Sequence, residues 1–303
     1  MYAGSVRRHP MKLNFKQRNI LLGTILMWPM MGIFLASLTN LLENDFFPEI
    51  TGFGRFALFA FAGLLLSAII SFLIPVFSPM TRAQNEIMDE LEQNGQTQRF
   101  IELTEQEINR LITTGKAYKH YQFFSQYVSL QADAFLIQHN PQAAIQSINR
   151  INLQDLQTYT GKVLADQQIL GYFDVQMAIA EELCNADMAN AVMRDASPYL
   201  QKVNEKNLGH FIIANEVYFC YYMATGNYAK AYEHARKYFD HTANRFCSFL
   251  GNSCSVKVFI KTGQFTEAER FLQNAEQQTT STPNQRQILA YLRESLNRAR
   301  AGM

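Results

Sequence analysis

Two long apolar runs stand out near the start of the chain, at residues 20–41 and 56–77. Neither run contains an Asp, Glu, Lys or Arg, and a short acidic loop joins them. A helix rises about 1.5 Å per residue, so each run would span roughly 33 Å, slightly more than the hydrocarbon core of a bilayer. A backbone in lipid must satisfy its own hydrogen bonds, which two helices do. The pattern therefore predicts a transmembrane hairpin over residues 20–79.

The charges beside the runs predict how the hairpin is oriented. Residues 1–19 are basic and carry no acidic residue, whereas the loop carries Glu43, Asp45 and Glu49 against Arg55. Basic flanks favour the cytoplasmic side, so we expect a multi-pass integral membrane protein in the lipid bilayer with both termini cytoplasmic. The first run is longer than a usual signal-peptide core and no clear small-residue cleavage site follows it, so we expect it to be retained.

Small residues recur at four-residue steps in both runs: Gly32 and Ala36 in the first, and Gly63, Ser67 and Ser71 in the second. This spacing lets helix backbones approach closely, so it predicts the faces on which the two spans pack. Two alternatives stay open. The same faces could join copies of the chain into a homo-oligomer, or the spacing could be chance among residues common in membranes.

From residue 82 onward the apolar residues follow helical rather than alternating spacing, and Gly and Pro are few. We therefore expect residues 82–303 to form an all-α domain. Within it we predict a solvated helix near 82–94, helices at about 97–113 and 116–138, and a capping helix at about 284–300. The many aromatic side chains within 116–138 indicate core packing more simply than a ligand cage.

A turn pattern repeats in the second half of the chain. Residues 224–231 (ATGNYAKA) and 261–268 (KTGQFTEA) both place Gly, then an aromatic residue two positions on, then Ala three positions later. Residues 185–191 and 139–144 repeat the shape more weakly. One helix pair cannot bury its apolar face alone. The repeat therefore predicts pairs stacked into a curved array whose inner surface is available to an extended partner.

These residues resemble the tetratricopeptide repeat, whose units are helix-turn-helix pairs with a small residue and an aromatic at the turn. The likeness covers residues 207–279 best and 116–204 weakly. Ala231 and Ala268 match the family's small residue where the two helices cross, whereas Asn215 and Asn252 stand where it prefers a bulky side chain. The resemblance implies an α-solenoid domain behind the two-helix membrane anchor.

The resemblance also implies that the first helices of the units line a groove for a protein partner. The candidate groove residues are Glu216, Cys220, Met223, Ser253, Lys257 and Lys261. The two lysines would meet a partner's carboxylates. We therefore expect a membrane-anchored protein-protein interaction scaffold or adaptor, and not an enzyme. The alternatives are a regulatory or assembly subunit of a membrane transporter or channel complex, and an enzyme whose site lies in the inner surface.

The net charge and the lack of known motifs limit the partners and cofactors that we expect. The formal net charge is +1, so no bulk field favours nucleic acid, and we expect no nucleic-acid partner. No P-loop, GxGxxG, GxSxG or HExxH motif occurs, and we expect no cofactor.

The cysteines have no CxxC pair, which suits a reducing compartment. One set could gather around a soft metal ion: His234, His241, Cys247 and Cys254. Its spacing matches no familiar zinc finger, and ordinary packing explains it more simply, so we expect no metal site.

Overall fold

The structure is a computed structural model of the chain, and it describes residues 79–158, 164–203, 207–241, 244–278 and 282–302. The predicted spans 20–41 and 56–77 lie outside these residues, as do the five small residues expected to pack them. No helix in the described ranges combines the length and the hydropathy that crossing a bilayer requires. Contacts divide the chain into two compact units, and residues 86–303 fall within one of them.

All regular structure in the described part is helical, which confirms the expected all-α class there. In chain order the helices are α3 (Pro79–Gln93), α4 (Gln98–Thr113), α5 (Tyr121–Ile137), α6 (Pro141–Ile148), α7 (Leu153–Thr158), α8 (Leu164–Glu182), α9 (Ala186–Leu200), α10 (Leu208–Ala224), α11 (Tyr228–Lys237), the 3-10 helix η1 (Tyr238–His241), α12 (Arg245–Lys261), α13 (Phe265–Gln278) and α14 (Pro283–Ala301). The predicted helix at 116–138 begins only at Tyr121, and Tyr118 before it is exposed.

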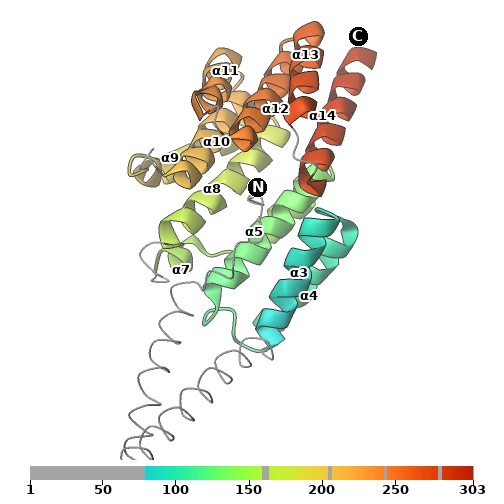
Figure 1. Cartoon of the computed structure of the whole chain (residues 1–303). Helices are drawn as coiled ribbons and strands as arrows, with labels where there is room; N and C mark the ends of the chain where they lie inside the picture. Colours follow the sequence, from blue (N-terminus) through green and yellow to red (C-terminus); the bar gives the residue numbers. More distant parts are fainter. Residues whose placement is uncertain (1–78, 159–163, 204–206, 242–243, 279–281, 303) are drawn as a thin grey trace, which may run out of the picture. The chain divides into compact units, whose positions relative to one another are not determined.

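Four pairs of consecutive helices make up most of this unit: α5 with α6, α8 with α9, α10 with α11, and α12 with α13. The first helices of successive pairs also pack together, α5 on α8 and α8 on α10, and α11 packs on α12 (Figure 1). Each first helix therefore has helices on several sides, which explains why α10 and α12 have buried residues on nearly every face. This packing is repeat-like, as the sequence repeat predicts.

The turn between the helices of a pair is the same in all four pairs. One residue in each turn has a positive φ, between 49° and 73°: His139, Cys184, Gly226 and Gly263. In three pairs the next residue is an Asn whose side chain accepts a hydrogen bond from the backbone N–H three residues later: Asn140, Asn185 and Asn227. This bond satisfies a donor that the helix start leaves without a partner.

A buried alanine stands five residues after the positive-φ residue in every pair. Ala231 and Ala268, expected at this position, are 0 % exposed, and so are Ala144 and Ala189 in the first two pairs. A methyl group at these points lets the second helix lie close to the first. The two upstream turns, which the sequence shows only weakly, thus belong to the same repeating unit as the two downstream ones.

Helix α14 packs on α13 and α12 and also reaches α5. Its Leu292 and Leu296 are 1 % exposed. Near its start, Gln287 Oε1 accepts a hydrogen bond of 2.9 Å from the backbone N–H of Gln96. Further along, the Tyr291 ring stacks on His139 with 4.5 Å between ring centroids. The helix predicted as a cap for the last pair therefore also contacts residues that precede the second pair.

A candidate binding cavity on the inner helices

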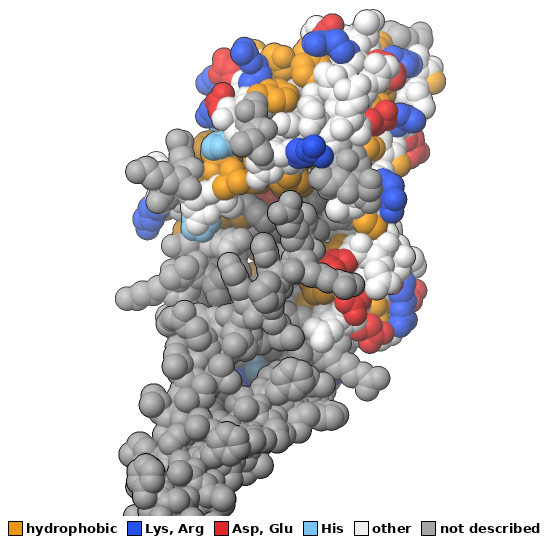
Figure 2. Space-filling view, viewed as in Figure 1, with side chains coloured by type: hydrophobic (Ala, Val, Ile, Leu, Met, Phe, Trp, Pro, Cys, Tyr) orange, Lys and Arg blue, Asp and Glu red, His pale blue; other side chains and the backbone are white. Residues whose placement is uncertain are grey.

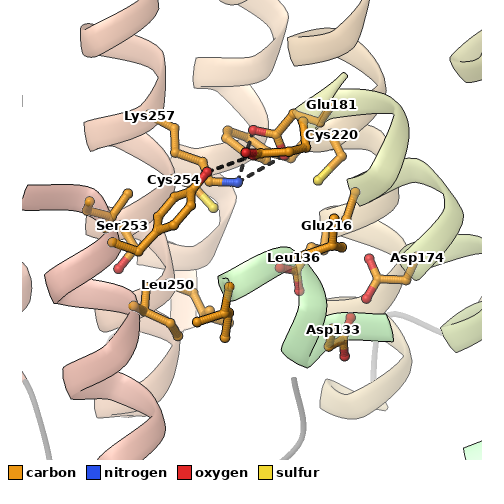
Figure 3. Close-up of a pocket in the computed structure, with 17 residues that line it drawn as sticks. Asp133, Leu136, Asp174, Glu181, Glu216, Cys220, Leu250, Ser253, Cys254 and Lys257 are labelled. Atoms are coloured by element: carbon orange, nitrogen blue, oxygen red, sulfur yellow. Dashed lines mark hydrogen bonds and ion pairs between the residues drawn. The ribbon is translucent and has the colours of Figure 1, made fainter. Parts of the chain in front are cut away.

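A cavity of about 130 Å³ lies between the first helices of the pairs and α14 (Figure 3). Its lining combines apolar side chains such as Leu136 and Leu250 with a set of charged ones. Those are five carboxylates and one ammonium group, from Asp133, Asp174, Glu181, Glu182, Glu216 and Lys257. The cavity is thus strongly acidic, although the chain as a whole is nearly neutral.

The residues that line the cavity stand at equivalent positions of successive repeats. Asp174, Glu216 and Ser253 each stand ten residues before the positive-φ residue of their own turn. Asp133 and Lys257 each stand six residues before theirs. Successive first helices therefore project their side chains into one shared space.

The two clear repeats predict Glu216, Ser253 and Lys257 as groove residues. Asp133 and Asp174 were not predicted, because the turns that follow them contain His139 and Cys184 in place of Gly. Aligning those two turns with Gly226 would have identified both residues.

The six groove candidates divide between two adjoining cavities. Glu216, Cys220, Ser253 and Lys257 line the acidic cavity, and Lys257 also lines a neighbouring cavity of about 430 Å³. Met223 and Lys261 line only that second cavity. The candidates therefore lie on one continuous face.

Lys257 is not available to a partner's carboxylate, because it already forms an ion pair with Glu181. Its Nζ lies 3.0 Å from both carboxylate oxygens of Glu181, which is 9 % exposed. Burial lowers the pKa of Lys257, but the adjacent Glu181 outweighs this effect, and the pKa ends well above its usual value. Lys257 thus stays charged and neutralises Glu181. Lys261, in contrast, is exposed, with its Nζ 3.4 Å from Cys184 Sγ.

A second polar group lies where the two cavities meet. The Tyr291 hydroxyl donates a 2.8 Å hydrogen bond to Glu182, and Nδ1 of His139 lies 3.3 Å from the other oxygen of the same carboxylate. Burial raises the pKa of Tyr291, so its hydroxyl remains a donor. Helix α14 is thereby fixed beside the cavity by groups from α8 and from the first turn.

The carboxylates of Asp174 and Glu216 have fewer hydrogen-bond partners among the described residues than those of Glu181 and Glu182. Burial raises the pKa of Asp174 well above its usual range, and the neighbouring Glu216 carboxylate raises it further. Burial likewise raises the pKa of Glu216. Oδ1 of Asp174 is buried and accepts no hydrogen bond from any described residue, and the same holds for Oγ of Ser253, whose residue is only 6 % exposed. The cavity therefore contains acceptors that the described part of the chain does not use.

The thiols and the serine hydroxyl that line the cavity lack the features of activated nucleophiles. Burial raises the pKa of Cys220 and Cys254 well above the usual thiol value, so both remain protonated and are weak nucleophiles. The Ser253 hydroxyl has no base within hydrogen-bonding distance among the residues that the structure describes. Nor do any three described His, Cys, Asp or Glu side chains lie where they could share a metal ion.

The four residues weighed as a soft-metal set lie in separate environments. Nδ1 of His234 lies 2.7 Å from Asn215 Oδ1, and the ring of His241 packs on Phe211. Cys247 and Cys254 are buried within α12.

Comparisons with protein-family models, with curated proteins and with solved structures found no match to this chain. The repeat is therefore described by features of the chain itself. These are a positive-φ residue in each of the four turns, an Asn that caps the second helix in three of the pairs, and a buried Ala five residues after the positive-φ residue. Function has to be inferred from the cavity and its lining.

Proposed function

We propose that this protein is a membrane-anchored protein-interaction module. In this proposal the apolar hairpin at 20–79 tethers a tetratricopeptide-like solenoid on the cytoplasmic side, and the inner face of the solenoid holds a segment of a protein partner. The apolar runs and their basic flank support the anchor. The paired helices with a common turn support the solenoid.

One observation carries the interaction role. Side chains at equivalent positions of successive repeats line one acidic cavity, and two of them, Asp174 and Ser253, hold buried acceptors that no described group satisfies. Buried polar groups in folded proteins nearly always have a partner, so such acceptors indicate that a partner comes from outside. A membrane tether would raise the effective concentration of that partner at the bilayer surface.

The test is site-specific photocrosslinking in isolated membranes. A photoreactive phenylalanine analogue replaces Lys261, which is exposed beside the cavities. A matched control places the same analogue at Glu233, which is exposed on the second helix α11. Membranes are washed with alkaline carbonate before irradiation, and we expect the full-length chain to stay with them.

We expect position 261 to give a discrete crosslinked protein, and position 233 to give none. Equal products from both positions, or none from position 261, would refute a partner on the inner face. Release of the full-length chain by carbonate would refute the membrane anchor independently.

A further inference from the structure

Two large hydrophobic side chains are exposed among the residues that the structure describes, and both lie where α4 leads into α5. Ile112 is 49 % exposed and Tyr118 is 61 % exposed. The other large apolar side chains in the described ranges are buried or half-buried. The two exposed residues therefore mark one local surface rather than scattered positions. We call residues 112–120 the α4–α5 corner.

The charged side chains of the corner are basic. Lys116 and Lys119 are both exposed, one on either side of Tyr118 in the sequence. Between Glu107 and Asp133 the sequence contains no acidic residue, although the chain as a whole has almost equal numbers of basic and acidic residues. The corner therefore combines positive charge with exposed apolar groups, which a surface that is both anionic and apolar would complement.

Backbone hydrogen bonds give the corner a defined shape. Gly115 ends α4 with a φ of 64°, and the backbone N–H of Lys116 donates a 2.9 Å hydrogen bond to the carbonyl of Leu111. The ring of Tyr118 stands beside that of the buried Tyr121, with 6.4 Å between ring centroids. The exposed tyrosine thus projects from a fixed base, and its exposure belongs to the folded corner.

The corner lies on the side from which the chain enters α3. A short connection joins α3 to α4, and Arg99 of α4 pairs with Glu86 of α3 at 3.2 Å, so the two helices run antiparallel, side by side (Figure 1). From this ion pair, α3 leads back to its start at Pro79, and α4 leads on to its end at Thr113. Both helices therefore lead to the same side. The apolar run at 56–77 ends just before that start.

We infer that the α4–α5 corner binds the surface of an anionic lipid bilayer. This inference rests on the anchor proposed above, which would place a bilayer on the side to which α3 and α4 lead. Tyrosine side chains favour the interface between lipid headgroups and water, and lysines are attracted to an anionic leaflet. Ile112 would add an aliphatic group that enters the boundary between headgroups and acyl chains.

The anchor would make this contact effective although the corner is small. Two lysines and two apolar side chains bind a bilayer weakly when they act alone. A tether in the same membrane makes the contact intramolecular, so a weak affinity is enough. The unit would then have two attachments to the membrane, and its inner face would be presented to partners in a restricted range of orientations.

The test uses the full-length chain with a single tryptophan, in vesicles that carry dibrominated lipid as a quencher of tryptophan at the bilayer. Trp28 is the one tryptophan of the chain, so Trp28→Phe together with Tyr118→Trp leaves one reporter, at the corner. The vesicles contain phosphatidylcholine alone or with about 30 % phosphatidylserine. We expect quenching to be at least about twofold stronger with phosphatidylserine, and to weaken at high salt because salt screens exposed charges.

A second reporter position and an apolar variant are needed beside the first reporter. Glu233→Trp, also combined with Trp28→Phe, places the reporter at an exposed position of α11 and should give no quenching. Ile112→Ser should weaken quenching at position 118 in both kinds of vesicle, because it removes apolar contact and no charge. Equal quenching at positions 118 and 233 would overturn the inference.

Charge reversal tests the lysines. Lys116→Glu with Lys119→Glu should lower quenching at position 118 at least about twofold in vesicles with phosphatidylserine. Both side chains are exposed, so we expect the fold to be kept, which circular dichroism checks. Lys230→Glu with Lys237→Glu, at exposed positions of α11, changes the net charge by the same amount and should leave quenching as it was. Quenching that the first pair leaves undiminished would overturn the inference, because the contact would not depend on anionic lipid.

An alkaline carbonate wash of the same vesicles separates this inference from the anchor. If the chain resists the wash and the reporter at position 118 stays unquenched, the anchor stands and the inference falls. A second copy of the chain or another protein on the corner would give this result. If the reporter is quenched but the wash releases the chain, the corner binds lipid and the anchor falls. A chain that is released and was never quenched would refute both.

Discussion

At the residue scale, Asn215 connects the two helices of the third pair. Its Nδ2 donates a 2.9 Å hydrogen bond to the carbonyl of His234, so its Oδ1 faces the imidazole Nδ1, 2.7 Å away. That nitrogen must therefore carry a proton, which it donates to Asn215 Oδ1. The rings of Tyr218 and Tyr222 pack on the imidazole.

The surroundings of His234 oppose its protonation. Burial lowers the pKa of His234 to about 4, and the charge of Lys237 contributes to the shift. The usual value is about 6.5. Between these two values the unfolded chain binds a proton that the folded chain does not. The folded state therefore loses stability as the pH falls from about 6.5 toward 4.

We expect Asn215→Ala to lower the free energy of unfolding by about 1–3 kcal/mol, because it leaves the His234 ring N–H and carbonyl without a partner in a partly buried site. Urea denaturation at pH 7 measures this. Asn252 is the matched control, since it occupies the same position in the next repeat but donates only to the Ser248 carbonyl within its own helix. Asn252→Ala should therefore cost less. Equal losses would show that the contact between helices contributes nothing of its own.

At the scale of elements, the unit that repeats is a turn with fixed backbone geometry rather than a fixed residue. Gly226 and Gly263 make two of the turns visible in the sequence, because glycine adopts positive φ without strain. His139 and Cys184 adopt the same conformation without being glycine, so the sequence shows those repeats only weakly. The alanine at the helix crossing is the signal that persists in all four pairs.

The presence or absence of glycine in the turn also determined which site residues could be predicted from the sequence. Glu216, Ser253 and Lys257 belong to the two clear repeats and were predicted as groove residues. Asp174, in an upstream repeat, was not. The pairing of Lys257 with Glu181 could not be predicted either, because the two residues are 76 positions apart in the sequence and their contact depends on how the repeats stack.

Cys184→Gly should raise the free energy of unfolding by about 1 kcal/mol, because a left-handed conformation strains any residue with a Cβ. Cys184 is exposed, so little packing is lost. Thermal unfolding measures the change. Cys184→Ala keeps the Cβ and removes only the thiol, whose contact with Lys261 Nζ is exposed, so it should have little effect.

The reverse substitution, at Gly226, tests whether the backbone conformation is the cause. Gly226→Ala should lower stability by about 1 kcal/mol, although a Cβ there would meet no atom within 4 Å. Any loss must therefore come from the backbone conformation. A neutral Gly226→Ala would show that the turn is not strained by a side chain.

At the scale of the whole described unit, two properties do not follow from the local sequence pattern. These are the place where the acidic side chains gather and the contacts between distant helices. Basic and acidic side chains are interspersed over the described helices in the view of Figure 2, in keeping with the net charge of +1, and the acidic residues of the site gather inside. Connectivity departs from a simple array, in which each repeat touches only its neighbours. Helix α14 joins the last pair to Gln96 and His139 near the start of the unit. Its apolar spacing predicts a buried face, but no local pattern could reveal these distant contacts.

These contacts should make the two ends of the described unit unfold together. In an array of neighbours alone, the first helices could open without disturbing the last. The double variant Gln287→Ala, Tyr291→Ala removes the hydrogen bond to Gln96 and the ring stacked on His139, and leaves the buried Leu292 and Leu296 of α14 in place. We expect amide hydrogen exchange in α4 and α5 to become about 5- to 30-fold faster, which corresponds to a loss of roughly 1–2 kcal/mol in their stability. Exchange in α12 and α13 should change less, because the apolar face of α14 still covers these two helices. Hydrogen-exchange mass spectrometry resolves the two regions, and Arg286→Ala, at an exposed position on the same helix, is the control. Unchanged exchange in α4 and α5 would mean that α14 covers only the pair before it, and that the first repeats hold their structure without it.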